Sequence, residues 1–165
     1  MEIQLIMGSN GSGKSLFAEQ AAVESGQKRI YIATMIPYTE ENRQRIAKHL
    51  DQRKDKNFST QEIPVDLDTA VVDSDSIVLL EDASNLLANE IFTKGNGADK
   101  VLKDIKNLAQ KCQKLIIVSI DGLCGEGFDG ETQNYINQLN TLNKQLCCIA
   151  DTVYIMSDGN AVKTK

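Results

Sequence analysis

The sequence predicts an α/β fold in which a mostly parallel sheet lies between two layers of helices. Strand-like and helix-like segments alternate along the 165 residues, which is typical of βαβ units. The segments 76–81 (SIVLLE) and 114–119 (KLIIVS) each hold four apolar residues in a row, as strands covered on both faces do. No linker, repeat or low-complexity stretch interrupts the alternation, so residues 1–165 are expected to form a single domain.

In the first half of the chain the pattern predicts two strands and two helices. The apolar run 3–7 predicts a strand, residues 16–23 a helix, and the β-rich run 29–34 a second strand. Residues 39–53 are polar apart from two apolar residues four positions apart, so this helix should be exposed over most of its surface. Thr39 is a suitable residue to begin it.

The second half of the chain is expected to complete the sheet. After the buried strand 76–81, the expected elements are a helix near 84–92, a loop at 94–97, a helix at 99–112, the strand 114–119, a glycine-rich loop at 121–130, a helix at 131–149 and a strand at 152–157. The loop at 121–130 is expected to lie over the active site. Asp158-Gly159 is a turn signal before a last short strand, which predicts a C-terminal antiparallel hairpin.

Residues 8–15 (GSNGSGKS) match G-x-x-x-x-G-K-[ST], the phosphate-binding P-loop, between the expected strand and helix. The glycines let backbone N–H groups point at phosphate oxygens, and the helix N-terminus adds partial positive charge. Lys14 would reach the β- and γ-phosphates, and Ser15 would hold Mg²⁺. The residues of this motif expected to bind the nucleotide are Gly8, Ser9, Asn10, Gly11, Ser12, Gly13, Lys14 and Ser15. We therefore expect a P-loop NTPase-type fold that binds ATP or GTP.

The strand 76–81 ends in Glu81, which Asp82 follows. In P-loop enzymes an acidic residue after a buried strand completes the Mg²⁺ site beside the serine of the loop. Either carboxylate could do so, and the alternative is that it caps the next helix. We favour the metal role, with Glu81 and Ser15 as ligands, because open α/β sheets bind ligands at the carboxyl ends of their strands.

Charge and composition limit the partners. The net charge is −5 and no basic stripe is present, which argues against a nucleic acid as the main partner. No apolar run approaches the roughly 20 residues of a membrane span, and no signal peptide is recognisable. Four cysteines without C-x-x-C spacing and a single histidine argue against a zinc site. A cytoplasmic protein with reduced thiols is expected.

The single histidine, His49, lies at the margin of the apolar stripe of the helix 39–53. From this position alone, a solvent-facing histidine without a special role is the simpler interpretation. Only its titration near neutral pH suits it to chemistry.

A longer pattern surrounds His49. It consists of Tyr31-Ile32-Ala33-Thr34, Glu41, Arg45-Ile46, His49, Arg53, Phe58, Thr60, Glu62 and Pro64. It resembles the Y-I-A-T…E…R-I-x-x-H-x-x-x-R…W-x-T-x-E-x-P pattern of the bifunctional adenosylcobinamide kinase / adenosylcobinamide-phosphate guanylyltransferase family, with Phe58 in the place of the tryptophan. The resemblance continues at Leu80-Glu81, Asn89, Asn143, Gln145 and residues 159–165, and so covers essentially the whole chain.

The resemblance implies a two-step enzyme of cobalamin biosynthesis, with a corrinoid as second substrate and a homotrimer as the assembly. The first step moves the γ-phosphate of ATP or GTP onto the aminopropanol hydroxyl of adenosylcobinamide. The second moves GMP from GTP onto that phosphate through a guanylylated histidine. His49 matches this nucleophile by position, and Lys14 would assist both steps. Thr34 and Glu62 belong to the same pattern and are expected, with Glu81, to contact the nucleotide.

The chain departs from the family after Ser119. The family has N-E-x-G-x-G-x-x-P there, whereas this chain has SIDGLCG with Asp121 in the place of the glutamate, and its later helix lacks the arginines of the family. Arg45 and Arg53 are retained, either as phosphate contacts or as solvated charges. Two other functions stay open: a P-loop kinase of another small molecule without the nucleotidyl step, and a non-catalytic nucleotide-dependent switch. For one phosphate site to serve both reactions, the helix 39–53 would have to bring His49 to it.

Overall fold

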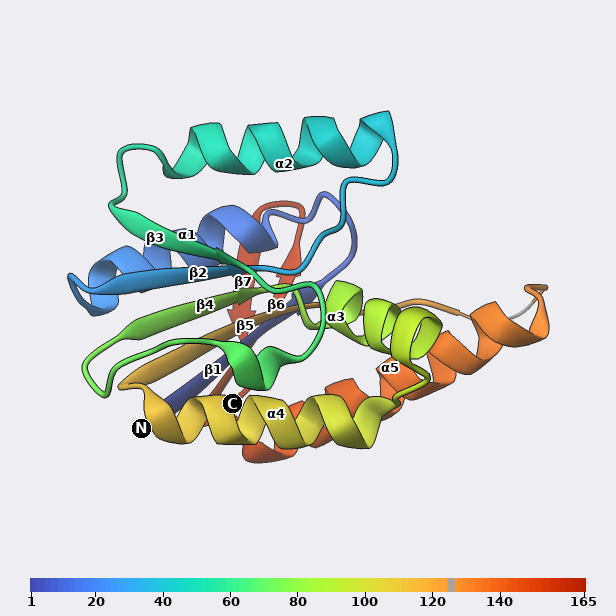
Figure 1. Ribbon diagram of the computed structural model, residues 1–165. Coiled ribbons are helices and arrows are strands. Elements are labelled where there is room, and N and C mark those ends of the chain that lie inside the picture. Colours follow the sequence, from blue (N-terminus) through green and yellow to red (C-terminus); the bar gives the residue numbers. More distant parts are fainter. Residues whose placement is uncertain (125–126) are drawn as a thin grey trace.

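A computed structural model, which describes residues 1–124 and 127–165, has a seven-stranded sheet between helices, in the order β3-β2-β4-β5-β1-β6-β7 (Figure 1). The strands are β1 (Glu2–Gly8), β2 (Arg29–Ala33), β3 (Phe58–Glu62), β4 (Ile77–Glu81), β5 (Lys114–Ile120), β6 (Thr152–Ser157) and β7 (Asn160–Lys163). All neighbouring strands are parallel except β6 and β7, which form an antiparallel hairpin. The expected fold class is confirmed.

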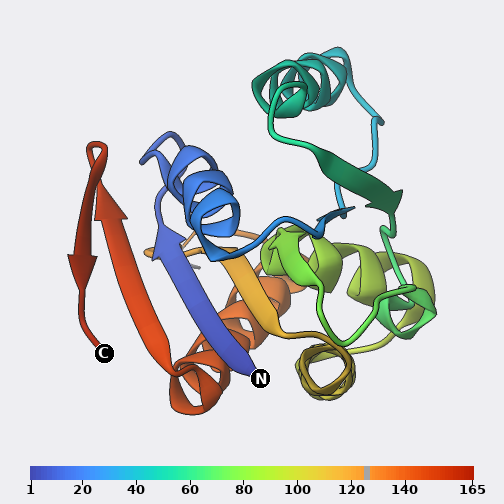
Figure 2. The same cartoon turned by 90° about the vertical axis from the view of Figure 1, so that its left-hand side faces the viewer.

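Helices cover both faces of the sheet (Figures 1 and 2). On one face lies α1 (Lys14–Ser25), and on the other lie α3 (Ala83–Asn89), α4 (Ala98–Lys111) and α5 (Gly130–Ile149). Successive residues of a strand point to opposite faces. In β4, Leu79 therefore packs in the core under α1 and Leu80 in the core under the other three helices. This double burial is the reason for the uninterrupted apolar run of that strand.

The helix α2 (Glu40–Arg53) stands apart from the rest of its layer, above α1, in both views (Figures 1 and 2). Thr39 caps it, since its Oγ1 accepts a hydrogen bond from the Asn42 N–H at 3.1 Å. Arg53 is its one buried residue, so the expectation of a mostly exposed helix is confirmed. Just beyond its end, Lys56 Nζ lies 2.5 Å from a carboxylate oxygen of Glu19, which is fully buried on α1.

Two elements differ from the sequence prediction. The sequence pattern does not predict strand β3, because it is a polar edge strand that buries none of its five residues and is held by backbone pairing to β2. The helix expected near 84–92 ends as α3 at Asn89 and continues as a π-helix, η2 (Glu90–Lys94). The buried Glu90 carboxylate there accepts hydrogen bonds from Asp66 N and Asn96 Nδ2, both at 2.7 Å. A short 3₁₀ turn, η1 (Leu67–Thr69), precedes β4.

The turn of the β6–β7 hairpin braces the P-loop. The Gly159 N–H donates a hydrogen bond to the Ser12 carbonyl at 3.0 Å. Gly13 has a φ of 93°, and a Cβ at this position would lie 3.3 Å from the Gly159 Cα. The P-loop is thus held between the first strand of the chain and the last hairpin.

The glycine-rich loop at 121–130 begins beside the P-loop strand, where the Asp121 N–H donates to the Gly8 carbonyl at 3.1 Å. Residues 125–126 of this loop lie outside the described residues. Among the residues that are described, none of the helices is long and apolar enough to cross a membrane.

Candidate active site

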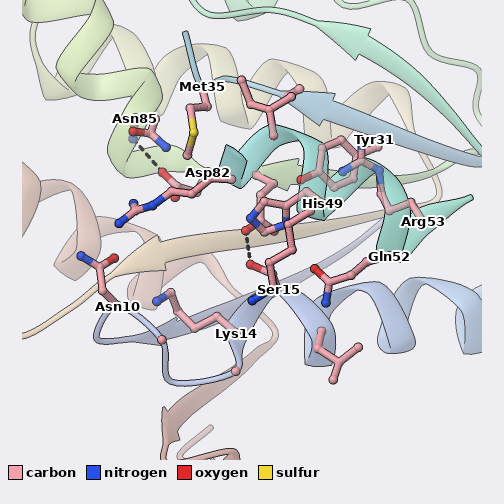
Figure 3. A pocket seen from close by; sticks show the side chains of 18 of the residues that line it. Asn10, Lys14, Ser15, Tyr31, Met35, His49, Gln52, Arg53, Asp82 and Asn85 are labelled. Atoms are coloured by element: carbon pink, nitrogen blue, oxygen red, sulfur yellow. Dashed lines mark hydrogen bonds between the residues drawn. The ribbon is translucent and has the colours of Figure 1, made fainter. Parts of the chain in front are cut away.

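A cavity of about 490 Å³ opens at the carboxyl ends of the central strands, between the P-loop and α2 (Figure 3). The P-loop lines one side and α2 the other. The lining side chains come from Asn10, Ser12, Lys14, Ser15, Leu16, Tyr31, Ala33, Met35, Arg45, Ile46, Lys48, His49, Gln52, Arg53, Glu81, Asp82, Asn85 and Ile120. Of the described loop residues after Ile120, none is among them, so this part of the loop does not cover the cavity.

Lys14 places a cation at the wall formed by the P-loop. It is 7% exposed, and its Nζ donates to the Ser9 carbonyl at 2.6 Å. Burial lowers the pKa of Lys14, while the nearby carboxylates of Asp82 and Glu81 act in the opposite direction. The Ser12 hydroxyl of the same loop is buried without a hydrogen-bond partner in the described structure. A lysine ammonium beside the unsatisfied Ser12 hydroxyl suits a phosphate ligand.

Glu81 and Asp82 point in different directions. The Ser15 hydroxyl donates a hydrogen bond to Glu81 Oε1, whereas Asp82 Oδ1 accepts from the Asn85 N–H at 2.7 Å and caps α3. The structure thus brings Glu81, and not Asp82, to the serine of the P-loop. The capping role that the sequence left open belongs to Asp82, and Glu81 stays free for the predicted metal role.

The Glu81 carboxyl is buried and has a raised pKa. Burial, reinforced by the charge of Asp82, raises its pKa to about 8. Its Oε2 atom is buried and has no hydrogen-bond partner among the described residues. An orphaned carboxylate oxygen beside a hydroxyl supplies the oxygen ligands that a hard divalent cation prefers. The residues present therefore fit a metal ion of this class.

His49 points from α2 into the cavity, toward Ser15 and Lys14 (Figure 3). It is half-buried, and its Nδ1 atom is buried without a partner in the described structure. Burial is the largest cause that lowers its pKa from the ordinary 6.5, followed by the charges of Arg53, Lys48 and Arg45. The imidazole is therefore neutral at neutral pH. The histidine therefore faces the cavity across from the P-loop and does not project from the outer surface of the helix.

Three cations of α2 also line the cavity. The guanidinium carbon of Arg53 lies 3.4 Å from the centroid of the Tyr31 ring, which is a cation–π contact. Arg45 pairs with Glu41 at 2.7 Å. Lys48 has no carboxylate partner in the part of the chain that the structure describes. Sequence reasoning missed Lys48, although its spacing of three residues from Arg45 puts both on one helix face.

Four residues expected in the nucleotide site are not among those that line the cavity: Gly8 and Ser9 at the start of the P-loop, Thr34 and Glu62. Thr34 is fully buried, and its Oγ1 accepts from the Asp82 N–H at 2.8 Å and lies 3.0 Å from the Glu81 carbonyl oxygen. It therefore holds the backbone that carries Glu81. Glu62 is exposed at the end of the edge strand β3. Asn89 belongs to the sequence pattern without a predicted role, and its Nδ2 bridges the carbonyls of Thr34 and Pro64 at 2.8 and 2.9 Å.

Residues 4–164 match the sequence model of the protein family described as cobinamide kinase / cobinamide phosphate guanyltransferase. The chain belongs to this family. It is accordingly a transferase, and the family connects it with cobalamin biosynthesis. A comparison with curated proteins found no match.

Solved structures share the fold at low identity. One of them, an ATPase domain, is 11% identical, with a TM-score of 0.56 over 93% of this chain and 68% of that one. A DnaB-like replicative helicase, solved in a study of its interactions with primase, is 10% identical with a TM-score of 0.52. This chain is covered to 93% and spans about half (47%) of the helicase. At such identities the likeness shows the P-loop α/β fold and nothing of substrate.

Proposed function

We propose that this chain phosphorylates the aminopropanol hydroxyl of adenosylcobinamide with ATP or GTP, and then transfers GMP from GTP to that phosphate through His49. The observation that carries the proposal is that His49 and the P-loop line one cavity from opposite sides (Figure 3). A nucleotide held by its β- and γ-phosphates on the P-loop would present its α-phosphorus toward α2. The family match supports the two reactions, and the homotrimer stays part of the proposal.

The state of His49 suits a nucleophile. Its lowered pKa keeps the imidazole neutral, and the burial of Nδ1 leaves Nε2 as the nitrogen that a ligand in the cavity can reach. In the nucleotidyl step, Nε2 forms a bond to the α-phosphorus, and the bond from that phosphorus to the bridging oxygen breaks. Pyrophosphate leaves, and GMP stays on the imidazole.

The P-loop supports both reactions through charge. Lys14 and the loop N–H groups would stabilise the departing pyrophosphate in GMP transfer, and the γ-phosphoryl group in the kinase step. Ser15 and Glu81 would hold Mg²⁺, which neutralises phosphate charge when bound. Because Glu81 is protonated in the cation-free site at neutral pH, it has to release its proton to become a ligand.

Guanylylation can be tested with GTP labelled at the α-phosphorus. The protein is incubated with this GTP and Mg²⁺ and denatured, and we expect an acid-labile, alkali-stable label on the chain. His49→Ala should abolish the label, because the nucleophile is lost. Gln44→Ala is the matched control, because Gln44 lies on the same helix, is exposed and does not line the cavity.

Phosphoryl transfer to cobinamide is measured in parallel with γ-labelled nucleotide. Lys14→Ala should abolish both reactions, and a surviving kinase reaction in that variant would contradict the role given to the P-loop. Kinase activity without any covalent GMP would show that the protein is a kinase that lacks the nucleotidyl step. Nucleotide binding without either transfer reaction would favour the non-catalytic nucleotide-dependent switch.

A further inference from the structure

GMP transfer through a histidine takes two displacements at the same phosphorus atom. In each displacement the entering and leaving groups lie on opposite sides of the phosphorus. The imidazole therefore enters on the side opposite to pyrophosphate. When the imidazole leaves, the acceptor oxygen has to enter on the side opposite to the imidazole, which is the side that pyrophosphate occupied.

In this cavity the side opposite to His49 is the P-loop. His49 reaches in from α2, whereas Lys14 and the N-terminus of α1 form the facing wall (Figure 3). The other cations near His49 do not meet this requirement. Arg45, Lys48 and Arg53 are on the same helix as His49, and so lie on the side from which the imidazole itself attacks.

We propose that the P-loop, once pyrophosphate has left, binds the phosphate of the acceptor, a phosphate monoester. One phosphate cradle then serves the donor and the acceptor in turn. This inference rests on the proposed function. It adds the acceptor site, because a terminal phosphate monoester offers Lys14 and the loop N–H groups the same oxygens as the phosphates of GTP do.

The second displacement balances without an added reactant. An oxygen of the acceptor phosphate forms a bond to the phosphorus of GMP, and the bond from that phosphorus to His49 Nε2 breaks. The electron pair of the broken bond returns to Nε2. A proton stays on Nδ1 throughout, so the neutral imidazole is regenerated.

If pyrophosphate and the acceptor phosphate bind to the same P-loop, this has a kinetic consequence that separate sites would not have. Pyrophosphate and the acceptor phosphate can each take GMP from the guanylylated histidine. Transfer to pyrophosphate gives GTP, and transfer to the acceptor gives a GDP-cobinamide product. If they occupy the same loop they exclude each other. Saturating pyrophosphate then suppresses formation of the cobinamide product completely.

The test uses the protein without substitutions. It is first guanylylated with α-labelled GTP, and unbound nucleotide is then removed. Cobinamide phosphate and pyrophosphate are added together with Mg²⁺ over a grid of concentrations, and labelled GTP and GDP-cobinamide are separated. We expect the ratio of labelled GTP to labelled GDP-cobinamide to follow the concentration ratio of pyrophosphate to cobinamide phosphate, without reaching a plateau. A constant ratio at saturation of both would show two sites and overturn the inference.

The remaining outcomes separate this inference from the proposed function. If no label forms, the proposed function fails and the inference with it. If the label forms but moves only to pyrophosphate, the guanylylated histidine stands and the acceptor site is refuted. Lys48→Ala should leave the product ratio unchanged, as should Lys106→Ala, an exposed lysine on α4. If Lys48 held the acceptor phosphate, its removal would shift the ratio about tenfold or more toward GTP.

Discussion

The guanidinium of Arg53 stacks on the ring of Tyr31, 3.4 Å from its centroid, and so joins the last residue of α2 to a strand inside the sheet. Arg53 is 6% exposed, while the rest of α2 stays partly or fully exposed to solvent. His49 lies four residues earlier, one turn along the same helix face. This contact therefore anchors the end of the helix that carries His49 into the cavity.

We expect Arg53→Ala to lower the free energy of unfolding by about 1 kcal/mol through the lost cation–π contact. We also expect it to slow guanylylation of His49 by about tenfold to a hundredfold, because the nucleophile is no longer held in place. Urea denaturation and the rate of labelling measure the two effects. Tyr31→Phe keeps the ring and should behave like the unmodified protein. Labelling of Arg53→Ala at an undiminished rate would refute the anchoring role.

Gly13→Ala should destroy nucleotide binding. The residue has a φ of 93°, and an added Cβ would lie 3.3 Å from the Gly159 Cα, so the loop would have to change shape. We expect the stabilisation by GTP, seen as a rise in melting temperature, to disappear. Gly130→Ala is the matched control, because this glycine begins α5 with no neighbour within 4 Å of the added atom. An unchanged shift with GTP in Gly13→Ala would contradict the brace by the hairpin.

The rate at which His49 is guanylylated should be maintained at mildly acidic pH. Burial and the charges of three cations of α2 hold the pKa of His49 below 6.5, so protonation removes the nucleophile only below that pH. The labelling rate should therefore fall with a midpoint below pH 6.5. Lys48→Gln removes one of those charges and should move the midpoint to higher pH, whereas Lys106→Gln should not. A midpoint above 6.5 in the unmodified protein would disprove the assignment.

In the absence of a cation, stability should fall as the pH rises from about 4.5 toward 8. The pKa of Glu81 is about 8 in the folded protein and 4.5 in an ordinary glutamate, so folding favours the protonated form. This contribution is complete below pH 4.5 and is lost as the pH rises through the folded pKa. Glu81→Gln cannot titrate and should flatten the dependence in urea denaturation at several pH values.

The unmodified protein and the Glu81→Gln variant also test the metal site. At pH 8 we expect Mg²⁺ to stabilise the unmodified protein, because the cation takes the place of the proton on Glu81. The Gln variant should gain little. Glu41→Gln, an exposed carboxylate on α2, should respond like the unmodified protein. Equal stabilisation of all three would show that the cation binds elsewhere.

The elements that could be predicted from the sequence are those whose signal is local. The P-loop is one contiguous motif, and β4 and β5 are apolar without interruption because both of their faces are covered. Strand β3 has no such signal, since its place depends on backbone pairing at the sheet edge.

The parts of the site that depend on side-chain direction needed the structure. Whether Glu81 or Asp82 meets Ser15 follows from which side chain points toward α1 at the end of β4. The position of His49 follows from contacts between residues far apart in the chain, Arg53 with Tyr31 and Lys56 with Glu19. No periodicity within α2 encodes these contacts.

The place of β1 in the sheet has a consequence for how the protein is made. This strand precedes its partners β5 and β6 in the chain, and it also precedes the Gly159 N–H that holds Ser12. A growing polypeptide therefore carries an unpaired apolar strand, a species prone to aggregation, until β5 and β6 have been made. A chain truncated before β6 and β7 would lose the Gly159 N–H that holds the Ser12 carbonyl, and with it the brace on the P-loop.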